Sequence, residues 1–347
     1  MVKQISLLLV TAMAVCLPTW QSTACTRVVY HGQDGMMLTA RSMDWQDDTH
    51  SNLWIFPRGM HRDGATGPNT VKWTSKYGSV IASFADMGSP DGMNEKGLVA
   101  NMLWLTESEY PKINLGKPGI SLGIWAQYTL DNFATVDEAV RFFETEPFAV
   151  YSAKMPGTDF TAAMHLSISD ASGDNAIFEY IKGKLVIYHD PSYQVMTNSP
   201  SFEKQLALAE YWKEIDGTTM LPGTNRSSDR FARAAFYINA VPKTGDARIA
   251  VAAAFSVIRN CSVPFGISTP SKPNISSTRW RSVSDQKNKI YYFETVLSPG
   301  VFWVNLNDID FSEKAKVQKL SLVNGETYAG DVTKEFKEAA PFKFAGL

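Results

Sequence analysis

Predicted strands and predicted helices come in separate blocks along this chain and do not alternate. Short β-rich runs follow position 25, then two helical patterns, a strand meander, three more helices and a final group of strands. A parallel sheet needs alternating strands and helices, so this order predicts an α+β fold with antiparallel sheets. Two packed sheets covered by helices on both outer faces, a four-layer αββα sandwich, fit the pattern.

The expected elements follow from apolar spacing. Strands are predicted at 25–30, 36–45, 53–56, 79–84, 97–105, 164–170, 175–181, 185–189, 193–197, 278–285, 289–296 and 301–306. Helices are predicted at 121–133, 201–215, 228–241 and 246–259. Thr135 and Glu138 form a capping box that opens one further helix.

The N-terminus has the features of a secretory signal peptide. Lys3 supplies a positive charge, residues 5–15 are apolar, and a proline then breaks the run. Ser22 and Ala24 are small residues at positions −3 and −1 before Cys25. The pattern predicts that residues 1–24 are removed and that the mature protein is periplasmic or secreted. The alternative is a buried N-terminal helix.

Composition limits the kind of protein that remains. We expect residues 25–347 to form one domain, although the length also allows two. Removal of Lys3 leaves 32 basic and 35 acidic residues, a net charge of −3. No basic surface for nucleic acid is expected from this balance, and no membrane-spanning run is present after position 25.

Two cysteines remain after that removal, Cys25 and Cys261, because Cys16 leaves with the signal. In an oxidising compartment they could form a disulfide. Cys261 follows an apolar helical stretch, which favours a small buried side chain instead. Both interpretations are open from the sequence.

Several common catalytic motifs are absent from the sequence. It contains neither a Gly-x-Gly-x-x-Gly segment, nor a phosphate loop, nor a His-Glu-x-x-His motif. No two of the five histidines have metal-ligand spacing on one helix. A Cys–His pair is the less favoured alternative. The histidines are His31, His50, His61, His165 and His189.

Cleavage before Cys25 would place a thiol beside a free α-amine. This amine has a pKa of about 7.7–8.0 and can act as a general base for the thiol. Arg41, on the second strand of the predicted hairpin, can lie near Cys25 and favour a thiolate. Asp44 could orient the α-ammonium group. Alternatively, Arg41 and Asp44 form a surface ion pair, and Cys25 is the acylated residue of a lipoprotein.

Six segments together resemble the choloylglycine hydrolase family, which contains penicillin V acylases and bile salt hydrolases. The resemblance extends from Cys25 almost to the C-terminus and is strongest to the Gram-negative penicillin V acylases, which also cleave acyl-homoserine lactones. The segments are CTRVVY, LTARSMDW, DGMNEKGL, MTNSP, LPGTNRSSDRFARAAF and NISSTRWRSVSD.

This resemblance implies an N-terminal nucleophile hydrolase that has no cofactor or metal and is often a homotetramer. It implies that Cys25 is the nucleophile, with Arg41 and Asp44 beside it. It further implies that Asn198 is the side-chain donor of the oxyanion hole and that Arg230 belongs to the catalytic centre.

One position departs from the bile salt hydrolase pattern. Ten residues after Asn94 that pattern has an asparagine as second oxyanion donor, whereas this chain has Trp104. In the resembling Gram-negative proteins this tryptophan and a second one, here Trp45, hold the acyl group. The alternative is that both indoles are core residues.

The expected activity is therefore hydrolysis of linear amides, namely penicillin V and long-chain acyl-homoserine lactones. Bile salt hydrolysis is the alternative within the family. A non-catalytic periplasmic lipoprotein that binds acyl ligands is the alternative of another class. We expect a small-molecule amide as partner, with no nucleic acid and no stable membrane insertion.

Overall fold

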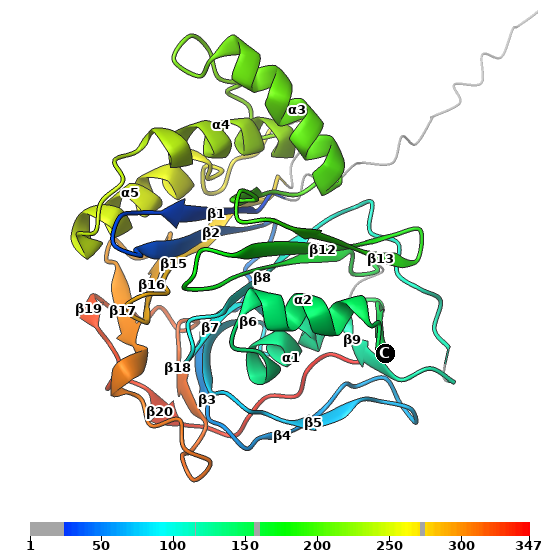
Figure 1. The fold of residues 1–347 in the computed structure, drawn as a ribbon. Coiled ribbons are helices and arrows are strands. Elements are labelled where there is room, and N and C mark those ends of the chain that lie inside the picture. Colours follow the sequence, from blue (N-terminus) through cyan, green and yellow to red (C-terminus); the bar gives the residue numbers. More distant parts are fainter. Residues whose placement is uncertain (1–23, 115, 156–159, 271–274) are drawn as a thin grey trace, which may run out of the picture.

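The computed structural model describes residues 24–114, 116–155, 160–270 and 275–347. Two large sheets pack against each other, with helices on both outer faces (Figure 1). The predicted α+β sandwich is therefore confirmed. The predicted signal peptide lies outside the described residues, apart from Ala24.

The first large sheet holds seven strands. In spatial order they are β14 (Val195–Met196), β1 (Thr26–His31), β2 (Met37–Trp45), β15 (Ser277–Asp285), β16 (Ile290–Thr295), β17 (Phe302–Asn305) and β19 (Gly330–Asp331). All neighbours are antiparallel except β17 and β19, which are parallel. This parallel pair lies at the edge of a sheet that is otherwise antiparallel, as predicted. The segment before it includes the 3-10 turn η2 (Leu306–Asp308).

The second large sheet holds nine strands, all of them antiparallel to their neighbours. In spatial order they are β13 (Lys184–His189), β12 (Asn175–Ile181), β11 (Met164–Ser169), β8 (Val99–Trp104), β7 (Gly88–Asn94), β6 (Ser79–Phe84), β3 (Leu53–Phe56), β18 (Gln318–Leu320) and β20 (Lys337–Glu338). Two small ladders complete the strands: β4 (His61–Asp63) with β5 (Lys72–Thr74), and β9 (Gly119–Ser121) with β10 (Ala149–Tyr151).

Helices cover the two outer faces. On the first sheet, α4 (Ser227–Ala240) and α5 (Ala247–Asn260) pack on β1 and β2, and α3 (Phe202–Ile215) packs on α4. On the second sheet, α1 (Trp125–Asn132) packs on β7 and β8, and α2 (Val136–Glu144) on β12 and β13. The helix predicted at 121–133 begins with a 3-10 turn, η1 (Leu122–Ile124). None of the helices described here has the length and apolar character needed to cross a membrane.

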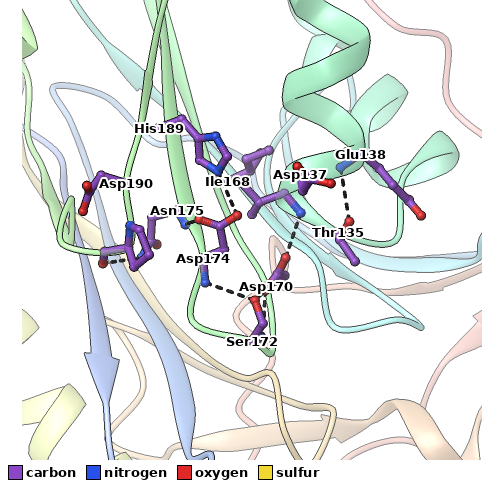
Figure 2. Close-up of polar contacts among 12 residues, drawn as sticks. Thr135, Asp137, Glu138, Ile168, Asp170, Ser172, Asp174, Asn175, His189 and Asp190 are labelled. Atoms are coloured by element: carbon purple, nitrogen blue, oxygen red, sulfur yellow. Dashed lines mark hydrogen bonds and ion pairs between the residues drawn. The ribbon is translucent and has the colours of Figure 1, made fainter.

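The start of α2 confirms the predicted capping box. The Thr135 hydroxyl accepts a hydrogen bond from the Glu138 backbone N–H at 3.2 Å (Figure 2). The Glu138 carboxylate in turn accepts one from the Ala134 N–H at 2.8 Å. Asp170, in the turn between β11 and β12, accepts a third from the Val136 N–H at 2.8 Å. Two N–H groups in the first turn of α2, and that of Ala134 just before it, thus have partners, and the helix is tied to the second sheet.

Candidate active site

Cys25 lies immediately before β1, and the β1–β2 hairpin sets its position. Thr26 pairs with Ser42, and Arg27 pairs with Arg41, in antiparallel register. Neighbouring strands are less than 6 Å apart, so this register brings the second strand of the hairpin to the sulfur. The predicted proximity of Arg41 to Cys25 follows from this pairing.

The thiol of Cys25 lies between a cation and a carbonyl group. Its Sγ is 4.0 Å from Nη2 of Arg41 and 3.8 Å from the backbone oxygen of Asp44. Ala24 precedes Cys25 in the sequence, and the two residues are only 1% and 4% exposed. Burial raises the pKa of the Cys25 thiol, and Arg41 only partly offsets this effect. In the uncleaved chain the sulfur is therefore a thiol that needs a base before it can attack.

Arg41 is held by several buried groups. It donates to the backbone oxygens of Pro90 at 2.5 Å and Met102 at 2.9 Å. Its Nη1 lies 3.7 Å from Oδ2 of Asp91, which is fully buried. Arg41 thus forms a buried ion pair with Asp91, and not the surface ion pair with Asp44 that was the alternative. Asp91 lies in the DGMNEKGL segment, but no pattern in the sequence indicates its role.

Asp44 is buried on the same strand as Arg41. Its carboxylate accepts hydrogen bonds from Thr278 at 2.5 Å and from Ser42 at 3.3 Å. Burial, partly offset by Arg230, raises the pKa of Asp44 to about 6. The expected contact of Asp44 with the α-ammonium group stays a prediction for the cleaved chain.

Replacing Asp44 by asparagine is expected to change how stability depends on pH. Because the folded-state pKa is raised from 3.8 to about 6, the folded chain keeps a proton that the unfolded chain releases. This contribution to stability is complete below the unfolded pKa and is lost as the pH rises through about 6. Asp44→Asn avoids that loss, so its stability relative to wild type should rise by about 3 kcal/mol between about pH 3 and pH 7.

Urea unfolding of protein that retains Ala24 measures this difference. The control is Asp48→Asn, which removes a carboxylate that is 62% exposed in place of a buried one. Parallel pH curves for wild type and Asp44→Asn would contradict the assignment of a protonated buried carboxyl.

Asn198 and Arg230 reach the same point from distant parts of the chain. Pairing of β14 with β1 brings Asn198, two residues after β14, beside Cys25. The Asn198 Oδ1 accepts from the Cys25 backbone nitrogen at 2.5 Å and from Nη2 of Arg230 at 2.9 Å. Arg230, on α4, also donates to the Cys25 carbonyl at 2.5 Å. The Asn198 Nδ2 donates to the Trp104 carbonyl at 2.8 Å, which fixes the orientation of the amide.

A cavity of about 290 Å³ opens above Cys25 and Arg41, and much of its lining is apolar. Trp45 and Trp104 both line it, with ring centroids 5.8 Å apart and planes at 52°. Phe84 packs edge-on against Trp45 at 5.7 Å. Further apolar side chains in the lining are Met43, Met87, Met102, Leu122, Met155, Phe160, Ala162 and Met164. The two tryptophans therefore border the space beside the thiol.

The cysteines are not joined to each other, and two of the histidines pair with carboxylates away from Cys25. Cys25 and Cys261 are both free thiols, so they do not form the disulfide that was one interpretation. Cys261 is fully buried, as predicted. His165 pairs with Glu179 at 2.9 Å, and His189 pairs with Asp174 at 2.8 Å (Figure 2).

The other three histidines lie apart from the thiol as well. His50 and His61 are exposed and contact Asp48 and Thr74. His31 ends β1, at the opposite end of the strand from Cys25. The geometry therefore does not favour a Cys–His enzyme. In the part of the chain that the structure describes, no three His, Cys, Asp or Glu side chains are placed to share a metal ion.

Two solved structures and one curated relative are similar to this chain. A penicillin V acylase of Pectobacterium atrosepticum is 51% identical over 96% of this chain and 95% of its own. The structure of a penicillin V acylase from Agrobacterium tumefaciens superposes with a TM-score of 0.87 at 57% identity, covering 93% of this chain and all of its own. A mutant conjugated bile acid hydrolase from Clostridium perfringens shares the fold, with a TM-score of 0.75 at 21% identity over 88% of this chain and 98% of its own.

The family comparison agrees with the site. The model of the linear amide C–N hydrolases of the choloylglycine hydrolase family matches residues 25–319, so the match starts at Cys25 itself. It includes each residue assembled around the thiol, from Arg41 to Arg230. This chain therefore belongs to the choloylglycine hydrolase family of linear amide C–N hydrolases.

Proposed function

We propose that this chain hydrolyses penicillin V to phenoxyacetate and 6-aminopenicillanate, with Cys25 as nucleophile. The observation that carries the proposal is the position of Cys25, whose thiol lies in a largely apolar cavity while its nitrogen contacts Asn198. A flat phenoxy ring suits a space bordered by two indoles. The two penicillin V acylases described above support the same substrate.

Removal of residues 1–24 would convert the Cys25 nitrogen from an amide into an amine. The amine takes the thiol proton, and Sγ then forms a bond to the amide carbonyl carbon. Asn198 stabilises the negative oxygen of the tetrahedral intermediate, and Arg41 favours the thiolate before attack. The ammonium returns the proton to the leaving nitrogen as the C–N bond breaks, which leaves a thioester. Water, deprotonated by the same amine, then attacks the thioester and releases the acid.

Long-chain acyl-homoserine lactones are proposed as a second substrate class, because the lining that suits a phenoxy ring also suits an alkyl chain. They have the same linear amide bond, and hydrolysis would release a fatty acid. Bile salts fit less well because a rigid steroid is bulkier than either acyl group and Trp45 and Trp104 narrow the space.

A hydrolysis panel tests this proposal. We expect phenoxyacetyl and long acyl amides to be cleaved well and glycocholate poorly, and Trp104→Ala to lower kcat/KM for the first two. Stacking against one indole contributes about 0.5–1.5 kcal/mol in addition to its burial, so its loss corresponds to roughly two- to thirteenfold in kcat/KM. Glycocholate as the best wild-type substrate would favour the bile salt alternative. Unchanged rates in Trp104→Ala would assign Trp104 to the core.

The lipoprotein alternative predicts a different N-terminus. A lipoprotein would carry an acylated Cys25 and no free amine, and it would bind acyl ligands without cleaving them. We propose instead a periplasmic or secreted protein that begins at an unmodified Cys25, in line with the first residue of the family match. Mass spectrometry of the N-terminal peptide distinguishes the two. We further propose a homo-oligomer, and a monomeric mass in light scattering of the purified protein would contradict it.

A further inference from the structure

The last residues of the chain return to the candidate active site. The C-terminal segment, residues 341–347, follows β20 and ends beside β9 (Figure 1). Ala345 and Gly346 line the same cavity as Cys25, together with Met87 and Leu122. No motif in the sequence indicates a role for this segment.

Backbone hydrogen bonds fix this segment against the body of the protein. The Ala345 N–H donates to the Met87 carbonyl at 2.7 Å, and the Ser121 hydroxyl donates to the Ala345 carbonyl at 2.5 Å. The Leu347 N–H donates to the Ala65 carbonyl at 3.0 Å. Hydrogen bonds thus hold Ala345 through both its backbone N–H and its carbonyl oxygen.

Two aromatic side chains anchor the segment further from the cavity. Phe342 packs against Trp54, with ring centroids 5.2 Å apart, and against Phe344 at 4.7 Å. The guanidinium of Arg62 lies over the Phe344 ring at 5.5 Å. This anchor precedes Ala345 in the chain, so the last three residues can be altered without removing it.

The segment approaches its neighbours closely. A Cβ added at Gly123 would lie 3.2 Å from the Ala345 carbonyl oxygen, and one at Gly346 would lie 2.6 Å from the Ala65 oxygen. There is little room for the backbone to retreat from the cavity. A larger side chain at Ala345 must therefore occupy space in the cavity that the acyl group of the substrate would otherwise fill.

We infer that the C-terminal segment forms one wall of the acyl-binding cavity and limits the size of the acyl group that the enzyme accepts. The inference rests on the proposed function, because it concerns the substrate of that same site. The segment contacts the β6–β7 turn, β9 and Ala65, whereas Arg41, Asn198 and Arg230 come from β2, the residues after β14 and α4. Ala345 and Gly346 thus determine specificity without taking part in the chemistry.

The test compares acyl groups of increasing size on one leaving amine. In Ala345→Phe, kcat/KM for phenoxyacetyl and decanoyl amides should fall by roughly tenfold or more, while that for the acetyl amide stays within about threefold. A chain that ends at Phe344 should show the opposite shift, with a relative gain for the bulkiest acyl groups. Lys343→Ala, an exposed side chain outside the cavity, is the matched control and should keep the wild-type profile.

Melting temperatures and the reaction of Cys25 with iodoacetamide establish that each variant is folded with an accessible thiol. Equal losses for every acyl length, or wild-type profiles in both variants, would overturn the inference while leaving the proposed function intact. If the wild-type enzyme cleaves none of the amides, the proposed function fails. Calorimetric binding of phenoxyacetate and decanoate to Ala345→Phe and wild type then tests the wall directly, and equal affinities would overturn it.

Discussion

A form of the protein that keeps one extra residue before Cys25 is expected to fold normally and to lose at least about 10³-fold in amidase activity. The reason is the state of the Cys25 nitrogen. With Ala24 attached, this nitrogen is a peptide N–H that donates to Asn198 at 2.5 Å and has no lone pair available as a base. Burial keeps the Cys25 thiol protonated, so without the amine the thiol has no base to activate it.

The measurement uses two preparations of the same domain. One begins at Cys25 after removal of a cleavable tag, and the other retains a single residue in front of it. Intact mass gives the N-terminus of each, and circular dichroism and melting temperature compare their folds. Equal kcat/KM values for penicillin V in the two preparations would rule out the α-amine as general base.

Asn198→Ala is expected to lower kcat by roughly 10²–10³-fold while changing KM much less. An oxyanion donor acts mainly in the transition state, so its loss affects turnover more than substrate binding. The structure adds a second cause, because Asn198 also joins the Cys25 nitrogen to Arg230 through its Oδ1. The alanine variant would leave both of those donors without their shared acceptor.

Gln205→Ala is the matched control for this variant. Gln205 donates to the backbone oxygen of Asn198 at 3.3 Å and to Thr197, and it is not part of the cavity lining. Its replacement should disturb the same loop while leaving the Asn198 side chain in place, with a loss of kcat well below that of Asn198→Ala. Similar losses in the two variants would mean that Asn198 acts through the loop and not as a donor. A kcat for Asn198→Ala within about twofold of wild type would remove it from the mechanism.

Much of the fold could be predicted from apolar periodicity. The strands at 53–56, 79–84 and 175–181 have the predicted bounds, because apolar residues dominate each run and turn residues follow it. β7 was not predicted. Its sequence, GSPDGMN, is rich in residues that are uncommon in strands. It is nevertheless a central strand, because β6 and β8 pair with its two edges. A register shift in the pairing with β6, between Ala82 and Phe84, accommodates Pro90.

The candidate site likewise contains some residues that local sequence patterns can place and others that they cannot. Arg41 and Asp44 could be placed near Cys25 from the hairpin alone, since local pairing determines their distance. Asn198 and Arg230 lie 173 and 205 residues from Cys25, and only the family resemblance indicated them. Asp91 was missed because its partner, Arg41, lies on another sheet. No local pattern reports a contact of that kind.

The burial of Ala24 and Cys25 also has a consequence for the order of events during biogenesis. A protease must hold several residues of extended chain around the bond that it cuts, and here Ala24 is 1% exposed once the two sheets have packed. The proposed cleavage therefore has to precede the closure of Asn198 and Arg230 around Cys25. Under the proposed cleavage, processing would compete kinetically with folding, and a chain that folds first would become a stable, dormant precursor.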